Sequence, residues 1–193
     1  MIVALSEVGQ EPAPLVWSNE RYLALVESGV IEEGRGVELI DGQVILCMPQ
    51  GELHQFIFFA LQVAFEGMRA AGQGLRTQPT VQVAQGQTYD PEFALLRPEA
   101  QSLRRLPRGD EVLFVVEVSV SSRTIDLGPK KASYARAGIP DYWVVDATKR
   151  GIWLFSDPAE GTYQTERFAP AGEALTVPVL GASLETGAVF PPE

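Results

Sequence analysis

The residue that most directly suggests chemistry is Glu117, which lies near the end of the apolar run 112–118 (VLFVVEV). A carboxylate buried in such a run takes up a proton or binds a cation, because an isolated charge is costly to remove from water. Ligand sites also gather at the strand ends of α/β sheets. Glu117 is therefore a candidate metal ligand. A position just beyond the buried region, or a pairing with a lysine, would also explain it.

Lys130 is the second unusual residue, because it directly follows Pro129. Proline is favoured at the first helical position, so the sequence predicts a short helix from Pro129 to about Gly138. Lys130 would then lie in the first turn, where the helix dipole disfavours a cation by roughly 0.3–1 kcal/mol. Facing an anion would offset this cost, and Tyr134 would share the same helix face. The alternative is that Lys130 and Lys131 are ordinary surface lysines.

Two further carboxylates precede another predicted strand. Asp90 and Glu92 flank a proline directly before the apolar run 93–97. If this strand lies beside 112–118, these side chains and Glu117 could converge on one cation. Ligation by oxygen alone favours Mg²⁺ or Mn²⁺ over zinc. Taken by itself, the segment around Asp90 is also typical of a polar turn.

Glu38, His54 and Cys47 are the remaining polar candidates. Glu38 lies in a β-rich run, where it either flanks the same region or faces solvent on an alternating strand. His54 and Cys47 are the only histidine and cysteine. With no third orienting residue evident, a thiol nucleophile is disfavoured, and one Cys and one His do not make a zinc site. The sequence also lacks the P-loop and G-x-S-x-G motifs.

Length and charge narrow the class of protein. The chain has 193 residues, a formal net charge of -10 and 46% hydrophobic residues, which fits one domain over 1–193 with a substantial core. The acidity disfavours a protein that simply coats DNA, but allows local contact with nucleic acid around a carboxylate-rich metal site. A single cysteine favours a reducing compartment. With neither a signal peptide nor a membrane span apparent, we expect a cytoplasmic protein with no membrane partner.

Hydrophobic periodicity and turn signals predict the elements that position these residues. Residues 1–17 form an extended arm, and the tail 157–193 adds one or two edge strands. The other expected elements are a helix from Ser18 to Gly29, a hairpin over 37–48 centred on Asp41-Gly42, a helix over 52–71, strands at 75–84, 93–97, 112–118, 141–146 and 152–155, and the short helix 129–138. This order indicates an α/β (α+β) fold with a mixed sheet and helices against it.

Taken in order, these pieces resemble the Uma2 family of restriction-type endonucleases, within the PD-(D/E)XK nuclease superfamily. The resembling segments include VELIDGQVI (37–45), DPEFALLRP (90–98) and VVEVSVSSRTIDLGPKKASYARAGIPDYWVVD (115–146). They cover the chain from about residue 18 to 156, and the third segment is the most specific. The resemblance implies a restriction-endonuclease-like mixed sheet flanked by helices, with an added N-terminal β-hairpin.

The resemblance also implies roles for single residues. Glu117 matches the signature glutamate, and Lys130 matches a lysine that the family has moved onto the following helix. Glu38 matches the glutamate of the first hairpin, and His54 matches the histidine of the helix after it. At the family's aspartate position this chain has Glu92. The extra methylene shifts the carboxylate by about an ångström, and errors of that size can cost on the order of 100-fold in rate. Catalytic competence is therefore a separate question from fold.

The resulting hypothesis is a phosphodiesterase, an endonuclease that cleaves nucleic acid with metal-activated water. Mg²⁺ or Mn²⁺ is the expected cofactor, nucleic acid (DNA in the first instance) the substrate, and a homodimer the expected assembly. The expected catalytic residues are Glu38, Glu92, Glu117 and Lys130, the metal ligands Glu92, Glu117 and Asp90, and the accessory residues His54, Asp126 and Tyr134. Two alternatives stay open: a non-catalytic binding protein with a nuclease fold, and a phosphohydrolase acting on small nucleotides.

Overall fold

The first helix forms as its end signals predict. The computed structural model describes residues 14–31, 36–47, 50–69 and 74–192, so most of the expected arm, residues 1–13, lies outside the described residues. Helix α1 (Asn19–Glu27) begins at Ser18, whose side chain accepts a hydrogen bond from the Arg21 N–H at 3.3 Å. Gly29, with φ +71°, follows the end of the helix, as predicted.

The predicted hairpin is β1 (Val37–Ile40) and β2 (Gln43–Leu46). Both turn residues, Asp41 and Gly42, have positive φ, which suits the twist of a two-residue hairpin. The hairpin belongs to a separate small sheet of order β2-β1-β5-β4, completed by β4 (Val81–Ala84) and β5 (Gln87–Tyr89). The sequence analysis did not predict β5, which is only three residues long.

The prediction of a single strand over 75–84 is wrong, because this segment is divided between two sheets. β3 (Gly74–Thr77) joins the large sheet, whereas β4 joins the small one. Gln78, at φ +47°, and Pro79, which has no N–H for a strand ladder, separate the two strands.

The large sheet has six strands in the order β10-β9-β8-β7-β6-β3. Its remaining members are β6 (Phe93–Leu96), β7 (Val112–Ser119), β8 (Asp141–Asp146), β9 (Gly151–Ala159) and β10 (Thr162–Pro170). β7 and β8 run parallel, and the other neighbouring pairs run antiparallel. The predicted mixed sheet is confirmed, with β7 and β8 at its centre.

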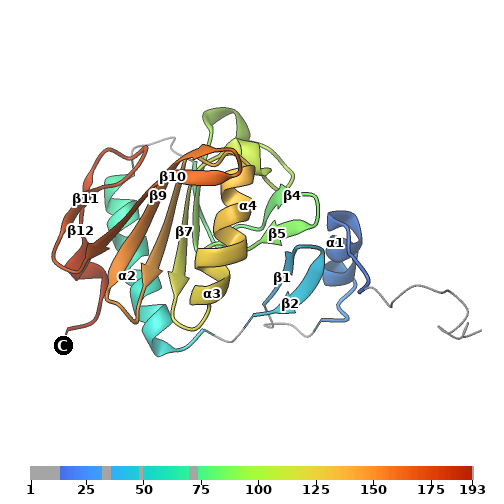
Figure 1. The fold of residues 1–193 in the computed structure, drawn as a ribbon, viewed down its shortest axis with the longest axis horizontal. Coiled ribbons are helices and arrows are strands. Elements are labelled where there is room, and N and C mark those ends of the chain that lie inside the picture. Colours follow the sequence, from blue (N-terminus) through green and yellow to red (C-terminus); the bar gives the residue numbers. More distant parts are fainter. Residues whose placement is uncertain (1–13, 32–35, 48–49, 70–73, 193) are drawn as a thin grey trace, which may run out of the picture.

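Helices cover both faces of the large sheet (Figure 1). α2 (Glu52–Met68) packs through Ile57, Leu61 and Phe65 on one face. α4 (Lys131–Arg136) packs on the other through Tyr134 and Ala135, in a core shared with the small sheet. Side chains alternate along β7, so its residues are divided between these two cores.

The helical connection between β7 and β8 begins earlier than predicted. A short helical segment, α3 (Arg123–Ile125), is followed by Asp126–Lys130 and then by α4. The chain kinks at Gly128 (φ −111°, ψ −105°), and this kink separates the first helical segment from a second one that begins at Pro129, as predicted. Lys130 therefore lies in the first turn of the second segment, where its contacts with the carboxylates of Glu38 and Glu117 offset the unfavourable helix dipole.

The tail contributes one edge strand, β10, and a second small hairpin, β11 (Ala174–Thr176) and β12 (Ser183–Glu185). Its apolar side chains, including Leu175, Val177 and Phe190, are buried in the same core as α2. These residues are used within the chain and are not free for another partner.

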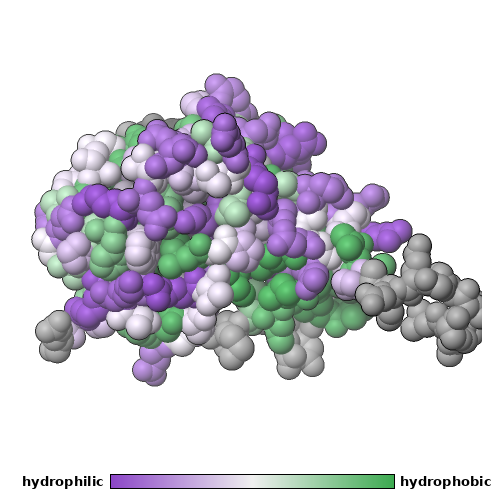
Figure 2. All heavy atoms as spheres, in the orientation of Figure 1, coloured by the Kyte–Doolittle hydropathy of each residue, from purple (hydrophilic) through white to green (hydrophobic). Residues whose placement is uncertain are grey.

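On the face of the molecule in Figure 2, the surface near the small sheet is less polar than the surface over the large sheet. Hydrophobic residues gather over β1 and β2, whereas the surface over the large sheet is mostly hydrophilic (Figure 2). Leu46 in β2 and Val16, beside the β1–β2 turn, are both exposed. None of the helices in the described ranges is long and apolar enough to cross a membrane.

Candidate active site

Glu117 lies in the interior of the protein, on the side of β7 that faces α4. Its side chain is only 3% exposed, whereas its neighbours Val116 and Val118 face the α2 core. Lys130 Nζ lies 3.0 Å from Glu117 Oε1, and the Tyr134 hydroxyl donates to the same oxygen at 2.8 Å. The carboxylate is therefore buried but partnered, and both partners come from the β7–β8 connection.

Lys130 joins the two sheets through its ammonium group. Its Nζ lies 2.8 Å from Glu38 Oε1 in the small sheet and 3.0 Å from Glu117 Oε1 in the large one. Asp126 Oδ1 is 3.9 Å away, and the Tyr89 ring centroid is 5.5 Å away. Although burial favours the neutral amine, the carboxylates of Glu117, Glu38 and Asp126 raise the pKa of Lys130 well above its ordinary value. The side chain is a buried cation.

Glu38 reaches this centre because β1 is an inner strand of the small sheet, between β2 and β5. All four β1 residues are buried, so Glu38 does not face solvent. Its Oε1 also accepts a hydrogen bond from the Asp90 backbone N–H at 2.9 Å. Asp90 itself is exposed, and this backbone contact ties it to the cluster.

Glu92 stands just before β6 and is held from two sides. Its Oε1 lies 2.8 Å from His54 Nε2, and its Oε2 accepts the Val118 backbone N–H at 2.8 Å. The last β6–β7 pair is Phe93 with Val116, so the Glu92 carboxylate takes the place of the next ladder partner. Glu92 and His54 are both buried.

Negative charge exceeds positive charge in this interior. Burial raises the pKa of Glu117 well above its ordinary value; Lys130 opposes this shift, and the carboxylates of Glu92, Asp126 and Glu38 add to it. Burial likewise raises the pKa of Asp126 to about 6, against the effects of Lys130 and of a hydrogen bond from Ser122. Three acidic side chains, Glu38, Glu117 and Asp126, thus share one buried ammonium, and Glu92 adds a further negative charge that acts on Glu117, an arrangement that favours a further cation.

The donor chemistry fits a hard divalent cation. Glu117 presents its carboxylate from β7, and Glu92 presents its carboxylate from the position directly before the adjacent strand β6. Across the described ranges, no group of three or more His, Cys, Asp or Glu side chains is placed to hold a metal ion. Mg²⁺ commonly binds through one or two carboxylates, with waters and substrate phosphates as its other ligands. Two carboxylates therefore suffice for this class of site.

Most of the residues singled out from the sequence lie in this one region. Glu38, Asp126, Tyr134 and Glu117 all interact with Lys130 or with each other, and Glu92 pairs with His54. The sequence analysis missed Tyr89, whose ring lies under Lys130 and against Tyr134 at 5.4 Å. Its strand is too short to give a periodic signal.

Cys47 lies near this cluster, but it is not an activated thiol. Burial and the Glu38 carboxylate raise its pKa to about 12, so the thiolate needed for nucleophilic attack is scarce near neutral pH. His54, its expected base in that alternative, bonds to Glu92 instead.

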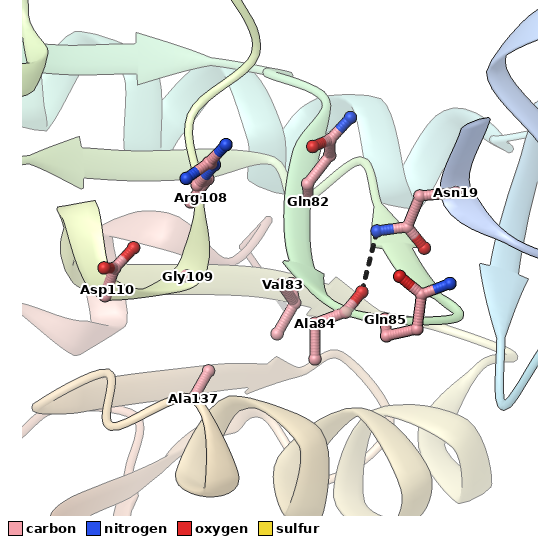
Figure 3. A pocket seen from close by; sticks show the side chains of 9 residues that line it. All are labelled: Asn19, Gln82, Val83, Ala84, Gln85, Arg108, Gly109, Asp110 and Ala137. Atoms are coloured by element: carbon pink, nitrogen blue, oxygen red, sulfur yellow. Dashed lines mark hydrogen bonds between the residues drawn. The ribbon is translucent and has the colours of Figure 1, made fainter.

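The loop before β7, which carries Arg104, Arg105 and Arg108, is remote from this cluster. A cavity of about 300 Å³ is lined by Arg108, Gly109 and Asp110, just before β7 begins at Val112 (Figure 3). Glu117 is five strand residues further on, a distance of about 16 Å. Within the loop, Arg105 forms a salt bridge with Glu111 at 2.6 Å. A contact from this loop to nucleic acid would lie several nucleotides away from the carboxylates.

Comparisons with known proteins agree with this architecture. A model of the Uma2 family, described as "Putative restriction endonuclease", matches residues 20–188. A solved structure described as "a putative nuclease belonging to DUF820", from Anabaena variabilis ATCC 29413, matches with a TM-score of 0.64 at 11% identity. That match covers 93% of this chain and 98% of the other, and at this identity it shows a common fold. No curated protein matches the chain.

Proposed function

The chain belongs to the Uma2 family, and from this premise we propose that it is a divalent-metal-dependent endonuclease acting on DNA. The observation that carries the proposal is the buried contact of the Lys130 ammonium with the carboxylates of Glu38 and Glu117. These three residues belong to three separate elements of the fold. A lysine and several carboxylates are costly to bury for structure alone. A site that handles a phosphodiester needs both kinds of group.

Each side chain has a role in this proposal. Mg²⁺ or Mn²⁺, held by Glu92 and Glu117, would supply an activated water and neutralise charge on the scissile phosphate. The ammonium of Lys130 has three donors, of which Glu38 and Glu117 take two, and it would offer the third to a phosphate oxygen. Tyr134 holds Glu117 in place, and Glu38 holds Lys130. Asp90, tied to the cluster through its backbone N–H, would supply a third carboxylate.

We also propose a homodimer, because cutting both strands of a duplex suits two-fold symmetry. The outward face of α2 is the surface that supports it. Four apolar side chains are exposed there: Leu53 (39% exposed), Phe56 (44%), Phe59 (56%) and Val63 (75%). These positions form one stripe along the helix, and residues 53–65 carry no Asp, Glu, Lys or Arg. Uncharged, aromatic surfaces are typical of the centre of an interface.

Cleavage of supercoiled plasmid in Mg²⁺ or Mn²⁺ tests the enzymatic proposal. We expect Glu117→Gln and Lys130→Met to lower nicking by roughly 100-fold or more, as losses of groups that stabilise a transition state do. Lys131→Met is the matched control, since Lys131 pairs with Glu166 at the surface, and it should cut as the wild type does. Circular dichroism would confirm that each variant folds. Metal-dependent cutting that survives both site substitutions would overturn the proposal.

A non-catalytic nucleic-acid-binding or protein-binding descendant is the second candidate. It is favoured by the glutamate at the aspartate position and by the net charge of -10. Calorimetric titration with Mn²⁺ separates the two candidates. A non-catalytic protein should not bind Mn²⁺ at millimolar concentration, whereas the proposed nuclease should have a Mn²⁺ site that is lost in Glu117→Gln.

A further inference from the structure

His54 touches none of the other groups around Lys130, yet it is buried beside Glu92. It lies in the first turn of α2, is 7% exposed, and faces the sheet together with Ile57 and Leu61. Its Nε2 lies 2.8 Å from Glu92 Oε1. Among the described residues, its Nδ1 has no hydrogen-bond partner, so the contact to Glu92 is the polar interaction that fixes the ring.

The contact matters because the Glu92 side chain is long and flexible. A longer side chain loses more conformational freedom when it is fixed, and its carboxylate can point in more directions. Here both oxygens are held, Oε1 by His54 and Oε2 by the Val118 N–H. Each oxygen keeps a second lone pair, so these bonds do not block a cation.

We propose that His54 is a positioning residue that orients the Glu92 carboxylate for metal binding. This inference rests on the proposed function. Because an ionised carboxylate only accepts hydrogen bonds, Nε2 carries the proton and donates it to Glu92. Hydrogen-bond partners of ligating carboxylates commonly contribute 10–100-fold to metal affinity.

The test is the dissociation constant for Mn²⁺, measured by titration calorimetry on the full chain. We expect His54→Leu to weaken binding by roughly 10-fold or more, because the donor is lost. His54→Gln should bind nearly as the wild type does, since its terminal amide places a donor at a similar reach. His54→Asn, whose amide is shorter, should be weakened. If His54→Leu does not fold, the difference in Mn²⁺ affinity between His54→Gln and His54→Asn tests the proposal.

A double-mutant cycle separates orientation of Glu92 from simple packing. In Glu92→Asp, the shorter side chain would not reach His54 and Val118 together, so His54→Leu should then change Mn²⁺ affinity far less than in the wild type. An equal loss in both backgrounds would mean that His54 acts through packing, and would overturn the inference. So would a His54→Leu protein that binds Mn²⁺ as tightly as the wild type. A wild type that binds no Mn²⁺ would instead overturn the proposed function, and the inference with it.

Discussion

At the scale of single residues, the buried cluster around Lys130 contains more negative than positive charge. Lys130 is held by Glu38 and Glu117, with Asp126 close by, and all four side chains are almost fully buried. Removing one partner of a buried ion pair commonly costs 3–5 kcal/mol, whereas apolar side chains of similar volume would often be at least as stable. The arrangement therefore costs stability, and the proposed role in binding an anionic substrate and a cation would account for it.

The raised pKa of Asp126 predicts a specific dependence of stability on pH. Burial raises its pKa from 3.8 to about 6, so the folded state holds this proton more tightly than the unfolded state. The stabilising contribution is complete below about pH 4 and is lost as pH rises through about 6. A shift of this size corresponds to about 3 kcal/mol.

Asp126→Asn removes this titration and keeps a polar side chain of the same size. Relative to wild type, its free energy of unfolding should therefore rise by about 2 kcal/mol between pH 4 and pH 7. Urea unfolding at several pH values measures the difference. A difference between the two proteins that stays constant over this range would contradict the assignment.

Some contacts of single residues could be predicted, because buried charges need partners. Glu117 was expected to bind a metal or to pair with a lysine, and it pairs with Lys130. Lys130 was expected to face an anion from the first turn of a helix that begins at Pro129, and from that turn it contacts Glu38 and Glu117. The pairing of Glu92 with His54 could not be predicted, because it depends on how α2 packs against the sheet.

At the scale of elements, the site depends on where strands end and how the connection bends. The connection places Asp126 Oδ1 3.9 Å from Lys130 Nζ across the kink at Gly128, and α4 then brings Tyr134 to Glu117. Gly128 and Pro129 are typical of a helix boundary, and the second helical segment begins there. The division of 75–84 between two sheets was missed because local patterns do not report which sheet a strand joins.

The loop before β7 packs closely against β4 and the end of α4. A substitution at Gly109 in this loop tests that packing. A Cβ on Gly109 would lie 2.6 Å from the Val83 backbone oxygen and 2.8 Å from Ala137 Cβ. Gly109→Ala should therefore lower the free energy of unfolding by about 1–3 kcal/mol. Gly67→Ala, at an exposed site in α2 with nothing within 4 Å, is the control and should raise it by up to about 1 kcal/mol. Equal stability of Gly109→Ala and wild type would show that this contact is looser than described.

At the scale of the whole molecule, the mixed sheet with helices on both faces could be predicted from the order of elements. The separate small sheet could not, because it joins the β1–β2 hairpin to β5 and β4, from a distant part of the sequence. The tail residues Leu175, Val177 and Phe190 are buried within the chain, so they are not free to form a dimer contact.

The outward face of α2 gives the dimer proposal a direct test. Phe59→Glu combined with Val63→Lys would place charges in an apolar contact, so the protein should change from dimer to monomer in light scattering coupled to gel filtration. Val30→Lys, also at a valine that is 75% exposed, should leave the dimer intact. Substitutions at exposed positions should alter monomer stability by only about 0.5 kcal/mol. A wild type that is monomeric at micromolar concentration would contradict this proposal.

The central claim is that Glu92 and Glu117 bind a divalent metal beside Lys130. Anomalous diffraction from crystals soaked in Mn²⁺ tests it most directly, because the ion is located without reference to activity. The account predicts an anomalous peak within about 2.0–2.3 Å of oxygens from both carboxylates, absent in Glu117→Gln crystals. Well-diffracting soaked crystals with no peak between β6 and β7, or with a peak that persists unchanged in the variant, would contradict it.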